Sequence, residues 1–112
     1  DRFQALRHTF ADCQTQMEIC KQFNYYVTKR LDMGEYAVKE ATMSKLQSTK
    51  MDDDVIYKCL QFLGGIGYME EYQLARLSRD SRLGPIGGGT SEILREVIAK
   101  IVIDGKDYKP AT

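Results

Sequence analysis

Apolar residues recur at steps of three and four along the first third of the chain. With a single interruption at Asn24, the series is Phe3, Leu6, Phe10, Cys13, Met17, Cys20, Val27 and Leu31. Such spacing places side chains on one face of a helix. It predicts a long amphipathic helix from Phe3 to about Arg30, about 40 Å long at 1.5 Å per residue. Gly34 predicts its end.

A second helical series extends from about Glu35 to Leu63 and includes Val38, Ala41, Leu46, Val55, Cys59 and Phe62. The acidic stretch from Met51 to Asp54 is interpreted as a solvated part of this helix, with a break there as the alternative. Three consecutive carboxylates point in different directions around a helix, which argues against a metal site.

Two shorter helices are predicted next, from about Glu70 to Ser81 and from Thr90 to Ile101 or Val102. The segment Gly64 to Tyr68 ends the second helix, and Gly105 and Pro110 oppose further helix near the C-terminus. No segment alternates with the period of a strand. We therefore predict a single all-α domain over residues 1–112, an up-and-down helical bundle of two long antiparallel helices and two shorter ones.

Charge, hydropathy and cysteine content argue against several classes of function. Sixteen basic and sixteen acidic residues cancel, which gives no electrostatic reason to expect a nucleic acid partner. No apolar run approaches the roughly 18 residues of a membrane span. Cys13 and Cys20 would lie about 10 Å apart on a helix, so we expect buried thiols in a reducing compartment rather than disulfides. The single histidine, His8, argues against a metal site.

Two junctions contain glycines beside a helix end. Gly87 to Gly89 precede Thr90-Ser91-Glu92, in which Thr90 is a good N-cap and Glu92 complements the helix dipole. Free N–H groups at such a start bind anions or carbonyl oxygens, although an ordinary capped turn has the same sequence. At the other junction, Gln61 lies one turn before Gly65. One interpretation is a hydrogen-bonding patch for a nucleotide-like ligand. The alternative is that the glycines only end the helix.

Neither junction holds a nucleophile beside a base. Thr90 and Ser91 have no histidine in sequence reach, and Asp80 is interpreted as a surface ion-pair partner of Arg79 or Arg82. The residues alone thus predict a helical domain with one or two ligand-facing loops and no catalytic machinery of its own.

The segment "QFLGGIGYMEEYQLARLSRDSRLGPIGGGTSEILREVIAK" closely resembles the C-terminal helical domain of the flavin-dependent acyl-CoA dehydrogenases. The stretches "FQALRHTFADCQTQME" and "ATMSKLQSTKMDDDVIYKCLQFLGG" resemble the first two helices of that domain. The combination Q-x-x-G-G-x-G-[YF], R-D-x-R and G-T-S-E at these separations is specific to the family.

The resemblance implies a longer enzyme with an α-helical, a β and this helical domain, assembled as dimers or tetramers. Its members bind FAD between subunits, oxidise acyl-CoA thioesters and pass electrons to an electron-transferring flavoprotein. The implied location is the mitochondrial matrix or the bacterial cytoplasm. Because the chain opens at Asp1 rather than at methionine, we expect a piece of such an enzyme, inactive alone.

The resemblance also assigns residues. Thr90, Ser91 and Glu92 would contact FAD at their helix start, and Gly89 would lie against the acyl thioester. Lys100 occupies a position where the family often has a substrate-contacting arginine. The segment that would reach the FAD of a neighbouring subunit consists of Gln61, Phe62, Leu63, Gly64 and Gly65, and Phe3 and Gln4 match another part of that site.

Gly88 stands where many members carry the catalytic glutamate of a Y-E-G-T-S pattern. Glycine accepts no proton, so the sequence resembles the isovaleryl-CoA and long-chain subgroup, whose glutamate comes from an earlier helix. That helix would precede Asp1. The small residues leave room for a branched or long acyl group. The alternative is a non-catalytic helical association module or dead homologue.

Overall fold

The computed structural model describes residues 2–69, 71 and 73–108, without the side chains of residues 2, 3 and 66. Its helices are α1 (Arg2–Asp32), α2 (Val38–Leu63), α3 (Gly65–Tyr68), α4 (Gln73–Ser81) and α5 (Ser91–Val102). The described residues contain no strand. The all-α prediction is confirmed, with two long and two shorter helices plus the single turn α3.

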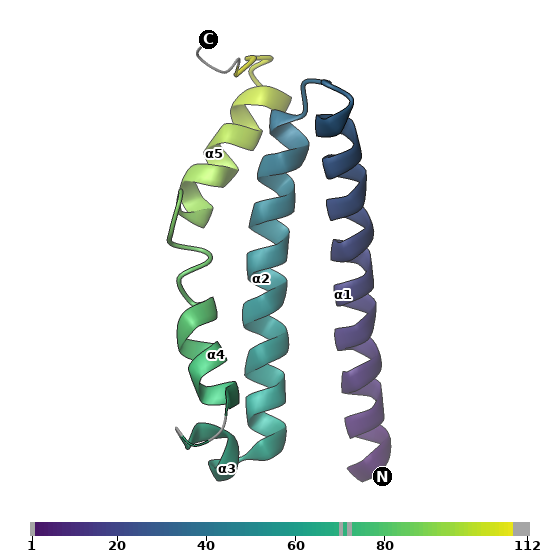
Figure 1. Ribbon diagram of the computed structural model, residues 1–112, viewed down its shortest axis with the longest axis vertical. Coiled ribbons are helices and arrows are strands. Elements are labelled where there is room, and N and C mark those ends of the chain that lie inside the picture. Colours follow the sequence, from purple (N-terminus) through teal and green to yellow (C-terminus); the bar gives the residue numbers. More distant parts are fainter. Residues whose placement is uncertain (1, 70, 72, 109–112) are drawn as a thin grey trace.

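The long helix α2 is the centre of the molecule. Figure 1 shows α1 antiparallel to it on one side, and α4 followed by α5 along the other side. Among the described helices, α1 packs on α2, and α4 and α5 both pack on α2 as well. The up-and-down connectivity is as predicted, but α1, α2 and the α4–α5 column form an open layer rather than closing around one core.

The open arrangement leaves the molecule extended. Its principal extents are 51 × 27 × 26 Å and its radius of gyration is 17.1 Å. A compact domain of this length has a radius of gyration of about 13 Å. The accessible surface is 8413 Å², whereas a compact protein of 12.8 kDa exposes about 6,300 Å². About 2,100 Å² of surface is therefore exposed beyond that of a compact fold.

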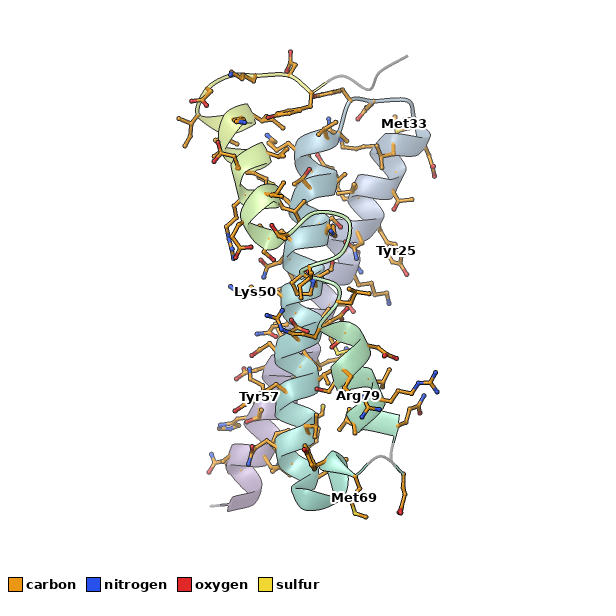
Figure 2. All side chains as sticks on the ribbon, turned by 90° about the vertical axis from the view of Figure 1, so that its left-hand side faces the viewer. Tyr25, Met33, Lys50, Tyr57, Met69 and Arg79 are labelled. Carbon is orange, nitrogen blue, oxygen red and sulfur yellow. The ribbon has the colours of Figure 1, made fainter. Side chains whose placement is uncertain are left out.

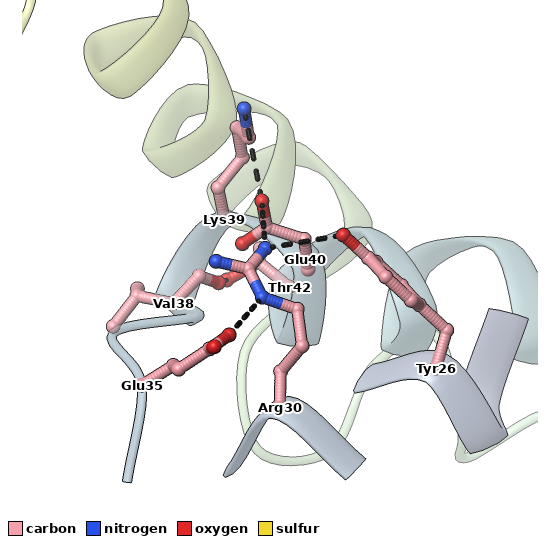
Figure 3. A network of polar contacts seen from close by, with 7 residues as sticks. All are labelled: Tyr26, Arg30, Glu35, Val38, Lys39, Glu40 and Thr42. Atoms are coloured by element: carbon pink, nitrogen blue, oxygen red, sulfur yellow. Dashed lines mark hydrogen bonds and ion pairs between the residues drawn. The ribbon is translucent and has the colours of Figure 1, made fainter. Parts of the chain in front are cut away.

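A polar network fixes the turn between the long helices. In Figure 3, Arg30 near the end of α1 donates to Glu35 at 2.8 Å and pairs with Glu40 of α2 at 3.0 Å. Its guanidinium also donates to the hydroxyl of Tyr26 at 3.4 Å. The bond to Glu35 is the main reason that the pKa of Arg30 is raised above its ordinary value. Because Glu35 belongs to this turn, α2 begins at Val38 rather than at the predicted Glu35.

The acidic stretch is a continuous part of α2, as predicted. Its carboxylates have different surroundings: Asp54 pairs with Lys58 at 2.9 Å, Asp53 accepts from Ser81 of α4 at 3.2 Å, and Asp52 is exposed. Within the described part of the chain, no three histidine, cysteine or acidic residues are grouped to hold a metal ion.

The sequence did not predict α3. Gly64 has φ +61° and ends α2 as expected, but the chain then makes one further helical turn. Gly67 in that turn lies so close to α2 that a Cβ would be 2.8 Å from Cβ of Leu63. Helix α4 begins at Gln73, later than expected, and the predicted first residue, Glu70, lies outside the described residues.

The apolar seam of α1 is only partly covered. Cys13, Cys20 and Val27 are buried against α2, whereas Phe10 is 50% exposed and Met17 44% exposed. All three cysteines are free thiols, and Cys59 is half-buried. Burial raises the pKa of the Cys13 and Cys20 thiols. No described helix is both long enough and apolar enough to cross a membrane.

Candidate functional site

The start of α5 has the capped geometry that the sequence predicts. Thr90 is in extended conformation, and its hydroxyl oxygen accepts from the N–H of Ile93 at 3.3 Å. The N–H of Ser91 donates to the carbonyl of Pro85 at 3.0 Å, which closes the preceding loop. Glu92 lies in the first turn, where its charge is favourable to the helix dipole.

Each glycine of the triplet has a structural reason. Gly88 has φ +70° and Gly89 has φ +118°, values that side-chain-bearing residues rarely adopt. A Cβ on Gly87 would lie 3.3 Å from the carbonyl oxygen of Leu83, which also accepts the N–H of Gly87 at 2.6 Å. The loop conformation therefore favours glycine at 88 and 89 through φ, and at 87 through a close carbonyl, whether or not a ligand approaches it.

Lys45 of α2 holds this loop, and the sequence analysis missed it. Its ammonium donates to the carbonyl of Gly87 at 2.5 Å and to the carbonyl of Gly89 at 2.9 Å. The sequence does contain an indication of this role. Lys45 follows Val38 and Ala41 at steps of three and four, so it lies on the same, apolar face of α2 as they do. The partner of that cation lies more than forty residues away, which no local pattern reveals.

A polar pocket of about 320 Å³ adjoins the start of α5. It is lined by the three predicted flavin-contacting residues Thr90, Ser91 and Glu92, together with Leu46, Lys50, Asp53, Arg82, Pro85, Ile86 and Arg95. Figure 2 shows Lys50 beside the loop that connects α4 and α5. The three basic side chains, Lys50, Arg82 and Arg95, outnumber the carboxylates of Asp53 and Glu92, so with the helix N-terminus they suit a ligand with anionic or carbonyl groups. The volume is at the low end for small-molecule sites, so it fits part of a large cofactor.

The second predicted cluster lies at the far end of the molecule, where Figure 1 places α3 and the N-terminus. Gln61, Leu63, Gly64 and Gly65 are exposed there, and a Cβ on either glycine would meet nothing within 4 Å. Phe62 is half-buried, with its ring 4.9 Å from that of Phe10.

The N-terminal members of the predicted site lie at this same end. Gln4 is exposed on the first turns of α1. Phe3 is in α1, but its side chain lies outside the described part. The backbone therefore brings Phe3 and Gln4 to the same end of the molecule as Gln61 to Gly65.

The two clusters lie at different levels of α2. Gln61 follows Asp53, which lines the pocket at the start of α5, by eight residues, about 12 Å along the helix, and it follows Lys45 beside the glycine loop by sixteen residues, about 24 Å. Lys100 is also remote from the glycine loop: it lies about 14 Å beyond Ser91 along α5. Lys100 is half-buried and pairs with Glu96 at 3.9 Å. The structure thus does not bring Gly89 and Lys100 together.

The remaining sequence predictions concern ion pairs and catalytic groups. Asp80 does form a surface ion pair, with Arg76 at 3.7 Å, while Arg82 approaches Asp53 of α2 at 3.8 Å. His8 is exposed on α1, away from Thr90 and Ser91 of α5. A larger hollow of about 690 Å³ between α1, α2 and α4 is lined by none of the predicted site residues.

These features define a helical domain in which the predicted ligand contacts form two separate clusters and much apolar surface is uncovered. Residues 2–103 match the family model described as "Acyl-CoA dehydrogenase, C-terminal domain". The chain belongs to this family, which the resemblance of its motifs had indicated.

Known relatives agree with this assignment. The chain is 34% identical to the short/branched chain specific acyl-CoA dehydrogenase of Bos taurus and 36% identical to the long-chain specific enzyme of Mus musculus. Each match covers 89% of this chain and 23% of the relative. A crystal structure of acyl-CoA dehydrogenase from Geobacillus kaustophilus superposes with a TM-score of 0.88 at 32% identity, over 89% of this chain and 26% of that one. The chain thus spans about a quarter of the length of these relatives.

Proposed function

We propose that this chain is the C-terminal, FAD-contacting and oligomer-forming domain of a longer enzyme that oxidises an acyl-CoA thioester between Cα and Cβ. The observation that carries the proposal is the Thr90-capped start of α5. In this chain, which belongs to the family, the start of α5 adjoins a polar pocket, and the glycine loop that precedes it is hydrogen-bonded to α2.

A flavin is the cofactor that the family implies, and we propose FAD. Thr90, Ser91 and Glu92 would hold it at the start of α5, with Lys50, Arg82 and Arg95 favouring its anionic groups. FAD, when bound, accepts the hydride from Cβ of the substrate. The residues of this chain orient the ligand and exclude water, while Gly88 supplies no group that takes a proton.

The second cluster would contact the FAD of a neighbouring subunit. Gln61 lies about 24 Å from the level of Lys45 and the glycine loop along α2, and Phe3 and Gln4 lie at the same end of the molecule. A separation of this size, together with the large excess of exposed surface, supports assembly as a dimer or tetramer. We further propose an electron-transferring flavoprotein as acceptor, in the mitochondrial matrix or the bacterial cytoplasm.

The acyl thioester would lie against Gly89. Since the carbonyl of Gly89 is bound to Lys45, and a Cβ here would lie 3.5 Å from Leu94, contact at this residue would use its N–H. Lys100 would meet a different part of the substrate, because it lies about two and a half helical turns further along α5. The missing side chains at Gly87 and Gly88 suit a branched or long acyl group, with the base coming from a helix upstream of this chain.

The test uses the full-length protein that carries this chain. We expect it to contain FAD and to show anaerobic bleaching of the flavin absorbance when a branched or long-chain acyl-CoA is added. A protein that holds no flavin and oxidises no acyl-CoA, yet assembles through this domain, would instead support the non-catalytic association module.

A further inference from the structure

The glycine loop is connected to α2 by a lysine that no sequence motif indicated. The half-buried Lys45 donates to the carbonyls of Gly87 and Gly89 at 2.5 and 2.9 Å. Both acceptors are main-chain atoms, so the contact constrains the path of the loop itself. Hydrogen bonds from an ionised donor are stronger than those between neutral groups, which makes this a firm tether.

The direction of these carbonyls determines what the loop presents on its other side. In a trans peptide, the C=O of one residue and the N–H of the next point in opposite directions. With the carbonyls of Gly87 and Gly89 turned toward Lys45, the N–H groups of Gly88 and Thr90 are turned away from it. Within the described part of the chain, neither N–H has a hydrogen-bond partner.

The backbone between the two carbonyls is adapted to this arrangement. Gly88 and Gly89 have φ of +70° and +118°, which lets two carbonyls two residues apart face one ammonium group. The loop leads directly into Thr90, whose hydroxyl caps α5. Movement of the Gly89 carbonyl would therefore also move the first residue of the candidate flavin contact.

We propose that Lys45 is a positioning residue for the ligand-facing side of the glycine loop. By holding the carbonyls of Gly87 and Gly89 against α2, it sets the direction of the loop N–H groups and the place of Thr90. It would contact neither cofactor nor substrate. The expected effect of Lys45 on turnover rests on the proposed function, whereas its expected effect on the loop conformation does not.

The experiment compares three variants of the full-length protein. Lys45→Met keeps most of the side-chain length and removes the donors, and Lys45→Arg keeps the charge and donors. Lys58→Met is the matched control, because Lys58 also lies on α2 but pairs only with Asp54 among the contacts the structure gives it. If Lys45→Met does not fold, Lys45→Gln, which keeps one donor group, replaces it.

Two readouts are measured for each variant. Amide hydrogen exchange follows Gly87 and Ser91, whose N–H groups bond within the loop. In Lys45→Met we expect exchange at these sites to be at least about tenfold faster, because the loop opens more readily. We expect kcat/KM for the acyl-CoA, normalised to bound flavin, to fall on the order of tenfold to a hundredfold, because reacting groups are misplaced. Lys45→Arg should recover most of both losses, and Lys58→Met should match the wild type.

The outcomes separate this inference from the proposed function. If the wild type turns over acyl-CoA and Lys45→Met behaves as Lys58→Met does, Lys45 has no positioning role. Failure of Lys45→Arg to recover either loss would also overturn the inference. If the wild type oxidises no acyl-CoA, the proposed function fails, and exchange at Gly87 and Ser91 alone decides whether Lys45 holds the loop.

Discussion

Thr90 caps α5 through one hydrogen bond, which its hydroxyl oxygen accepts from the N–H of Ile93. Thr90→Val keeps the shape of the side chain and removes the acceptor. We expect it to lower the free energy of unfolding by about 1 kcal/mol, whereas Thr90→Ser, which keeps the hydroxyl, should have little effect. Denaturant unfolding of both variants measures the difference, and equal stability of the two would contradict the assigned cap.

Gly88 allows a test of whether the loop lines the acyl pocket. Gly88→Ala and Gly88→Glu both place a side chain at φ +70°, a strain of about 1–2 kcal/mol. A Cβ on Gly88 would lie 3.4 Å from the ammonium of Lys45, so only the glutamate adds bulk beyond Cβ and a carboxylate that can pair with this lysine. In the full-length enzyme we expect Gly88→Glu to shift the preference toward shorter acyl chains relative to Gly88→Ala. An acyl-CoA substrate series measures this shift, and identical profiles for the two variants would remove Gly88 from the pocket.

At the scale of elements, the turn between α1 and α2 depends on Arg30. It bonds Glu35 and pairs with Glu40, whereas the nearby Lys39 makes only a 3.8 Å pair with Glu40 among the contacts given for it. We expect Arg30→Met to lower the denaturation midpoint clearly more than Lys39→Met, because it frees the end of α1 from the start of α2. Equal midpoints would show that the network contributes nothing to the hairpin.

The packing of α1 on α2 can be tested by the reactivity of its two buried thiols, Cys13 and Cys20. Burial raises the pKa of Cys13 and Cys20, so their reactive thiolate form is scarcer at neutral pH than in the unfolded chain, and its fraction rises only at higher pH. We expect both to react with a thiol reagent more slowly than the half-buried Cys59 at pH 7. Reaction of all three at the rate of the unfolded chain would show that α1 does not pack on α2 in this way.

Elements with local signals were predicted well, and contacts between distant elements were not. Apolar spacing predicted α1 and α2, and the Thr-Ser-Glu start predicted the cap of α5. The turn α3 was missed because glycines at 64, 65 and 67 oppose helix by propensity, while close packing of Gly67 on Leu63 favours it. Lys45 was missed because its partners lie on a loop that only the fold brings to α2.

At the scale of the whole molecule, the exposed apolar surface predicts association. Figure 2 shows Tyr25 and Met33 projecting from α1, and these side chains are 59% and 65% exposed. With about 2,100 Å² exposed beyond a compact fold, the chain has more uncovered surface than the roughly 800 Å² that one partner buries in a standard interface. We expect the isolated chain to self-associate in sedimentation velocity experiments, and a clean monomer at high concentration would contradict this.

The most direct test of the account is a crystal structure of the full-length protein with FAD and an acyl-CoA analogue bound. The account predicts that Thr90, Ser91 and Glu92 contact the flavin and that Gly89 lies against the thioester. It also predicts that Gln61 to Gly65 reach the FAD of a neighbouring subunit. A structure in which the start of α5 faces bulk solvent, remote from the cofactor, would contradict it.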